Sequence, residues 1–180
     1  PWPAPRMCAP LLAALVLAGL VTVSRAPPTP PAARLSQRLT ITLPEDAPLA
    51  APGVVSPSHD RPAIALSPDG TRLAYVAQMH DTTRICIRDM TTGKVIPLAG
   101  TEGAHTPFFS PDGDAIGFFG GNQLQRISLN GGGPLALADA PNPWGAVWAP
   151  DGTIYFSRYE GEGVQRVAAD GGPVQVITTG

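Results

Sequence analysis

The sequence repeats one short pattern three times. The pattern is an apolar segment, the turn Pro-Asp-Gly and a second apolar segment, and its copies are 65–76, 108–119 and 147–156. The turns follow one another at intervals of about 40 residues, and a fixed period of this length is the signature of a repeat architecture. The period therefore constrains the fold more than any local propensity does.

The residue types of the repeated turn close a tight β-hairpin. Proline presets φ for the first central position, aspartate suits the second, and glycine accepts the left-handed conformation that follows. The flanking aliphatic, β-branched and aromatic residues are those that strands favour. A structural role is therefore predicted for all nine turn residues, which are Pro68, Asp69, Gly70, Pro111, Asp112, Gly113, Pro150, Asp151 and Gly152.

A functional ring of carboxylates is the alternative explanation for the three aspartates, since one recurs in each repeat. Turn chemistry is favoured, because an aspartate in this place hydrogen-bonds its own backbone.

Two more strand-like segments follow each hairpin. Four strands in about 40 residues is the unit of a β-propeller blade. The abundance of proline (22) and glycine (20), with only 14% charged residues, fits an all-β fold with many short strands. We therefore predict an all-β partial propeller over 63–180, with four-stranded antiparallel blades at about 63–100, 105–137 and 144–178.

Three blades cannot close a ring, because propellers typically have about 4–8 blades. An open arc would also leave unpaired strand edges. We therefore expect the chain to be a fragment of a longer polypeptide, with residues 1–6 as the end of a truncated upstream segment.

Residues 7–24 are apolar and uncharged, between Arg6 and Arg25. A membrane-spanning helix needs about 17–25 such residues, which this stretch provides. A secretory signal needs a shorter core and a small-x-small cleavage site. The site at 24–26 precedes Pro27, which is a poor context for cleavage. One hydrophobic helix, a transmembrane helix or signal anchor, is predicted at 7–24, with a cleaved signal or a buried soluble helix as alternatives.

The segment between this helix and the repeats is rich in proline. Residues 25–37 favour extended polyproline II and predict a semi-rigid linker that holds a folded domain off a membrane. Residues 38–43 alternate polar and apolar side chains and predict a strand. Several prolines from Pro44 onward predict that the rest of 38–62 is a loop.

Composition and motifs exclude several classes of function. The net charge is −2 with no basic stripe, so no nucleic-acid partner is predicted. The residues of Ser58-His59-Asp60 are consecutive and cannot form a catalytic triad, and no G-x-S-x-G motif is present. The histidines and the two cysteines lack metal-ligand spacing. No catalytic residue, cofactor or metal site is therefore predicted.

Aromatic residues divide by position. Those inside the predicted strands are assigned to packing between blades, namely Phe108, Phe109, Phe118, Phe119, Trp148, Tyr155 and Phe156. Trp144 and Tyr159 lie nearer strand ends and loops, where ligand surfaces are commonly built. They are the candidate ligand-binding residues.

The hairpins at Ser67–Gly70 and Ser110–Gly113, with Ala149–Gly152 as a variant, resemble the WD40-like repeat of TolB-type bacterial β-propellers. The resemblance covers about 63–178. The longer stretches 100–113 and 142–154 are similar to the extracytoplasmic half of membrane-bound bacterial serine/threonine protein kinases. The order of anchor, proline-rich linker, strand and propeller matches that family as well.

This resemblance implies a non-catalytic propeller that senses or binds a protein or peptide. It implies a single-pass protein of the bacterial inner membrane, with the propeller in the periplasm, a kinase domain before the anchor, and the strand 38–43 in the ring-closing blade. The kinase motifs themselves are absent from this chain. Two alternatives stay open: a soluble periplasmic TolB-like protein of envelope transport, and the gating propeller of a serine peptidase whose catalytic domain follows.

Overall fold

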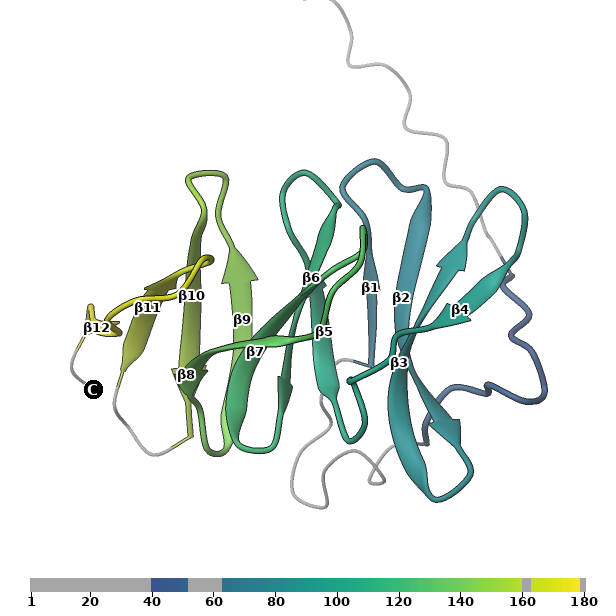
Figure 1. The fold of residues 1–180 in the computed structure, drawn as a ribbon, viewed down its shortest axis with the longest axis horizontal. Coiled ribbons are helices and arrows are strands. Elements are labelled where there is room, and N and C mark those ends of the chain that lie inside the picture. Colours follow the sequence, from purple (N-terminus) through teal and green to yellow (C-terminus); the bar gives the residue numbers. More distant parts are fainter. Residues whose placement is uncertain (1–39, 52–62, 160–162, 179–180) are drawn as a thin grey trace, which may run out of the picture. The chain divides into compact units, whose positions relative to one another are not determined.

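Three four-stranded antiparallel sheets make up the fold (Figure 1). The computed structural model describes residues 40–51, 63–159 and 163–178, and all of these except Thr40 belong to one unit, Ile41–Gly180. Within the described residues there is no helix. The all-β prediction of three four-stranded antiparallel units is confirmed.

Each sheet uses four strands that are consecutive in the chain, and we call the sheets blades 1 to 3. Blade 1 contains β1 (Ile64–Leu66), β2 (Arg72–Met79), β3 (Thr82–Asp89) and β4 (Val95–Pro97). Blade 2 contains β5 (His105–Phe109), β6 (Ala115–Gly120), β7 (Gln123–Ser128) and β8 (Leu135–Asp139). Blade 3 contains β9 (Pro143–Trp148), β10 (Thr153–Arg158), β11 (Val164–Ala168) and β12 (Gln175–Val176).

The first strands of successive blades lie side by side. β5 contacts β1 on one side and β9 on the other. The repeated Pro-Asp-Gly turns join β1 to β2, β5 to β6 and β9 to β10, all at the upper end of Figure 1. The strands β5 and β9 therefore begin at the opposite, lower end.

Blade 2 is buried on both faces. Side chains alternate along β6, so Ile116 and Phe118 pack with Ala74 and Ile85 of blade 1. Their neighbour Phe119 packs instead with blade 3, in a cluster that includes Leu124, Ile154, Phe156 and Val167. Every residue of β6 is buried as a result.

The segment 41–51 covers the face of blade 1 that points away from blade 2. Ala47 packs with Tyr75, Ala77 and Cys86, and the Tyr75 hydroxyl donates a 3.0 Å hydrogen bond to the Ala47 carbonyl. Burial raises the pKa of Tyr75 to about 12. This face of blade 1 is therefore closed by the chain that leads into it.

The predicted strand 38–43 is not seen in its described part. Residues 40–43 belong to no strand, and the first bridge in this segment pairs Leu49 with Ala77. A turn, in which the Ala47 amide donates to the Pro44 carbonyl, directs the chain onto blade 1. Within the described residues 40–43, Thr40 and Thr42 are exposed while Ile41 and Leu43 are half-buried, and Leu43 packs against blade 1. Pairing within a ring-closing blade stays a prediction.

The predicted hydrophobic helix at 7–24 and linker at 25–37 lie outside the described residues. Among the residues that the structure describes, none forms a helix long and apolar enough to cross a membrane.

Gly113→Val tests the turn of blade 2. Gly113 has φ of +78° and is buried, so a β-branched side chain is strained there. We expect the free energy of unfolding to fall by about 1–3 kcal/mol, measured by denaturant titration of the full-length protein. Gly133→Val is the matched control, because Gly133 is exposed, lies outside the positive-φ region and has open space around it. If both substitutions lowered the free energy of unfolding equally, the predicted backbone strain at position 113 would be wrong.

Candidate binding surface of the third blade

The three Pro-Asp-Gly turns have one geometry. Gly70, Gly113 and Gly152 have φ of +73°, +78° and +81°. In each turn the glycine amide donates to the carbonyl three residues earlier, at 2.9 to 3.1 Å. The nine predicted turn residues therefore lie in three equivalent hairpin turns.

The aspartates of these turns bind their own turns. Asp69 accepts hydrogen bonds from the Ser67 hydroxyl at 2.6 Å, the Thr71 amide at 3.0 Å and the Thr71 hydroxyl at 2.8 Å. These bonds, with the one from Ser67 foremost, lower the pKa of Asp69 from 3.8 to about 2. The Ser110 hydroxyl and the Asp114 amide lower the pKa of Asp112 in the same way. The bonding capacity of these carboxylates is largely used locally.

Blade 3 departs from this pattern by one residue. Ala149 takes the place of the serine, so Asp151 receives no serine hydroxyl bond, and the Thr153 amide, at 2.9 Å, is the first cause of its lowered pKa. The turn nevertheless keeps its shape, which indicates that the backbone bonds define it.

Trp144 and Tyr159 lie against each other at the other end of blade 3. Their ring centroids are 5.5 Å apart with an interplanar angle of 33°. Fifteen positions separate them in sequence, but the antiparallel pairing of β9 with β10 brings them together. Both are largely exposed, at 53% for Trp144 and 57% for Tyr159. The structure thus unites the two residues that the sequence singled out.

A β-bulge presents Trp144. Ser157 pairs with Gly145 and Arg158 pairs with Pro143, so Trp144 is the extra residue and is pushed out of the ladder. Asn142, with φ of +47°, starts this irregularity, and its carbonyl accepts a 2.9 Å bond from the Tyr159 amide. Sequence reasoning missed Asn142, although the dipeptide Asn-Pro is a turn signal.

This aromatic pair suits contact with a protein or peptide. Tryptophan and tyrosine offer wide apolar faces with one polar group each, and they are enriched at interaction hot spots. Because they lie at strand ends, they can contact a partner without disturbing the packing between blades.

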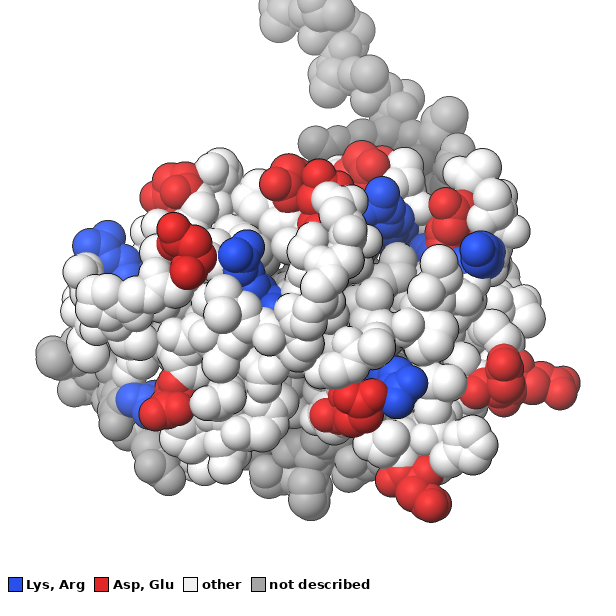
Figure 2. Space-filling model, viewed as in Figure 1, with Lys and Arg blue, Asp and Glu red and all other residues white. Residues whose placement is uncertain are grey.

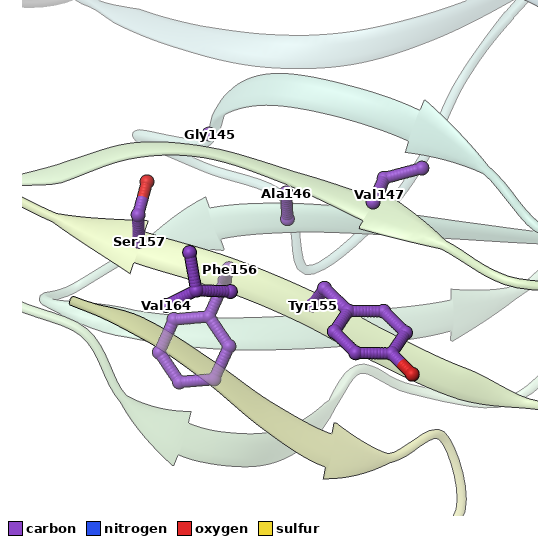
Figure 3. Close-up of a pocket in the computed structure, with 7 residues that line it drawn as sticks. All are labelled: Gly145, Ala146, Val147, Tyr155, Phe156, Ser157 and Val164. Atoms are coloured by element: carbon purple, nitrogen blue, oxygen red, sulfur yellow. The ribbon is translucent and has the colours of Figure 1, made fainter. Parts of the chain in front are cut away.

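A groove opens on the face of blade 3 that points away from blade 2. It has a volume of about 240 Å³ and is lined by Gly145, Ala146, Val147, Tyr155, Phe156, Ser157 and Val164. Figure 3 shows these residues on three neighbouring strands, with the Tyr155 ring beside β11. Packing between blades was predicted for both Tyr155 and Phe156. Both residues line the groove, but only Phe156 also packs into the cluster between blades 2 and 3, and Tyr155 does not belong to that cluster.

Charges are dispersed on the face drawn in Figure 2. Acidic and basic side chains are interspersed there, and none gathers into a large patch of one sign. Within the described ranges, no three His, Cys, Asp or Glu side chains are grouped as a metal site would need. His105, for example, stacks on Phe119 with ring centroids 5.9 Å apart.

Ser67→Ala should raise the pKa of Asp69, because it removes the largest cause of the lowering. A carboxylate whose pKa is lower in the folded than in the unfolded state stabilises the fold at a pH above its unfolded-state pKa. This stabilisation is lost as the pH falls through the folded-state pKa. For Asp69 that window lies between 3.8 and about 2. Carboxyl chemical shifts measured by NMR during an acid titration would show the change. Asp151, which has no such serine, is the internal control, and an Asp69 pKa unchanged by Ser67→Ala would contradict the assignment.

No protein-family model matches this chain. Among solved structures, a TolB-type protein from Agrobacterium tumefaciens is similar at 25% identity and a TM-score of 0.51, over 62% of this chain and 46% of that one. TolB from Acinetobacter baumannii is similar at 22% identity and a TM-score of 0.50, over 65% of this chain and 32% of that one.

The β-propeller domain of the Trilobed protease from Pyrococcus furiosus shares the fold. Its identity is 19% and its TM-score 0.52, over 64% of this chain and 40% of that one. The chain thus spans less than half the length of each of these three structures. The structural neighbours of the three blades are thus TolB and other β-propeller proteins, which is consistent with TolB-type, WD40-like propeller repeats.

Proposed function

We propose that this chain is a non-catalytic binding and sensing part of a β-propeller, and that its ligand is a protein or peptide. The observation that carries the proposal is the exposed Trp144–Tyr159 pair. Two large aromatic side chains, held by a bulge outside the packed core, are costly to leave in water and favourable to cover.

The proposed setting is the extracytoplasmic part of a single-pass bacterial serine/threonine protein kinase. The sequence supports it through the apolar stretch 7–24, the proline-rich stretch 25–37 and the resemblance of 100–113 and 142–154 to that family. In this setting the linker is a semi-rigid spacer between the inner membrane and the propeller. Ligand binding would act on the kinase only through a difference in affinity between its signalling states.

A second candidate is a periplasmic TolB-like protein that docks envelope proteins. The 25% identity to the Agrobacterium protein favours it. In that case residues 7–24 are a cleaved signal. The similarity to a peptidase propeller is one of fold alone, so the gating propeller of a serine peptidase has no comparable support.

Photo-crosslinking tests the binding surface. A photoreactive residue at position 159 of the full-length protein, in cells of its source, should give one defined adduct. The same residue at exposed position 133, in the β7–β8 loop, is the control. Trp144→Ala should lower the adduct yield about tenfold or more, because truncating a hot-spot aromatic costs about 2 kcal/mol or more of binding. An adduct of equal yield at both positions, or one indifferent to Trp144→Ala, would contradict the proposal.

Phosphorylation tests the setting. The complete gene should encode a kinase domain before residue 1, and the full-length protein should transfer the γ-phosphate of ATP to serine or threonine of itself or an added protein. A start codon close upstream with no further domain would support the TolB-like candidate instead. A G-x-S-x-G hydrolase after the propeller would support the peptidase.

A further inference from the structure

At the border between blades 1 and 2, the chain itself supplies a cation. Arg72 is the first residue of β2 and follows the Pro-Asp-Gly turn of blade 1. Its guanidinium donates a 3.2 Å hydrogen bond to the Gly113 carbonyl, in the turn of blade 2, and lies 3.9 Å from the Asp114 carboxylate. One guanidinium thus connects two successive turns at the upper end of Figure 1.

The border between blades 2 and 3 has no counterpart of this guanidinium. Ala115 is the equivalent of Arg72, because the amide of each donates a 2.9 Å hydrogen bond to the serine hydroxyl at the start of its turn. Leu129, which follows β7, is likewise replaced by the smaller Ala169 after β11. A cleft of about 250 Å³ is open at this border, and its lining includes Pro111, Asp112, Trp148, Pro150 and Ala169.

Asp112 contributes a carboxylate oxygen that the turn does not use. In blade 1 both oxygens of Asp69 accept hydrogen bonds, and its Oδ2 accepts from the Thr71 hydroxyl at 2.8 Å. Asp114 stands in place of Thr71 in blade 2, and an ionised carboxylate cannot donate. Asp112 Oδ1 accepts from the Ser110 hydroxyl and the Asp114 amide, whereas its Oδ2 accepts no bond from another residue in the described ranges. The cleft therefore has a carboxylate oxygen available to a ligand.

Trp148 gives the cleft an aromatic wall. Its half-buried ring meets the Phe108 ring edge-on, with ring centroids 6.4 Å apart and an interplanar angle of 68°. Tryptophan is the side chain whose face attracts cations most strongly. Pro111 and Pro150 line the same cleft, and apolar surface of this kind suits the alkyl stem of a long cationic side chain.

We infer that this cleft binds the guanidinium of an arginine side chain from a protein or peptide partner. Asp112 is its counter-ion, and Trp148 is the surface on which the planar group stacks. The partner's arginine takes the role that Arg72 has between blades 1 and 2. The inference does not rest on the proposed function, because the Trp144–Tyr159 pair lies at the opposite end of blade 3.

Fluorine NMR of the full-length protein, labelled with fluorotryptophan, tests the inference. The probe is N-acetyl-arginine methylamide, and Trp148→Phe identifies the resonance to follow. This resonance should shift and saturate with the probe. The citrulline analogue, which has the same shape without the charge, should bind about tenfold more weakly or worse. No shift of the Trp148 resonance, or an equal response to citrulline, would overturn the inference. Equal affinity for the lysine analogue would overturn the assignment to a guanidinium.

Asp112→Asn tests the counter-ion. Asparagine can still accept from the Ser110 hydroxyl and the Asp114 amide, so the turn should persist. Loss of the charge should weaken binding of the arginine probe about tenfold or more. Asp69→Asn is the matched control, since Asp69 has the same position in the turn of blade 1 and does not line the cleft. Equal losses of affinity in the two variants would contradict the role of Asp112.

Ala115→Arg supplies the guanidinium from within the chain. It places an arginine at the position equivalent to Arg72, so this arginine should occupy the cleft and abolish the response of the Trp148 resonance to the probe. A thermal midpoint within about 5 °C of the parent shows that the variant is folded. A folded Ala115→Arg protein that still binds the probe would overturn the inference. If this variant does not fold, Asp112→Asn and its control decide.

Discussion

The described structure depends on the insertion of two side chains from each blade into the preceding blade. Ile116 and Phe118 of blade 2 pack into blade 1, and Ile154 and Phe156 of blade 3 pack into blade 2. A four-stranded sheet of this size cannot bury both of its own faces, so its apolar side chains need neighbours. Blade 2 shows the result, with β6 buried along its whole length between blades 1 and 3. The stability of each blade is therefore shared with the next, as in other repeat architectures.

This dependence separates the parts of a blade that can vary from those that cannot. The strands pack against neighbouring blades. The carboxylates of the Pro-Asp-Gly turns accept hydrogen bonds from the backbone of their own turns and from neighbouring hydroxyl groups. The strand ends remote from these turns take less part in packing and in turn formation. The bulge at Trp144 lies at such a strand end, and it places the Trp144 ring beside the Tyr159 ring in an exposed pair.

The two outer faces of the three-blade unit are treated differently. The segment 41–51 closes blade 1 by laying Ala47 over Tyr75, while blade 3 leaves Val147 and Val164 open. The outward face of blade 3 is mixed, because Ser157 and Arg166 share it by register with Tyr155 and Val164. The cover over blade 1 comes from a segment outside the blade, so the composition of the blade alone does not reveal it.

The sequence by itself determined the repeat, the hairpin turns and the three four-stranded units seen in the described residues. Their signals are local, since a Pro-Asp-Gly turn between alternating apolar residues specifies a hairpin wherever it occurs. It also marked Trp144 and Tyr159 from their places near strand ends. Only the tertiary structure decided that these two rings meet, because their contact depends on the bulge in β9. It likewise decided that 40–43 pairs with no strand and that Phe156, unlike Tyr155, packs into the cluster between blades 2 and 3. Those outcomes depend on which faces of the blades are covered, and coverage is a property of segments distant in sequence.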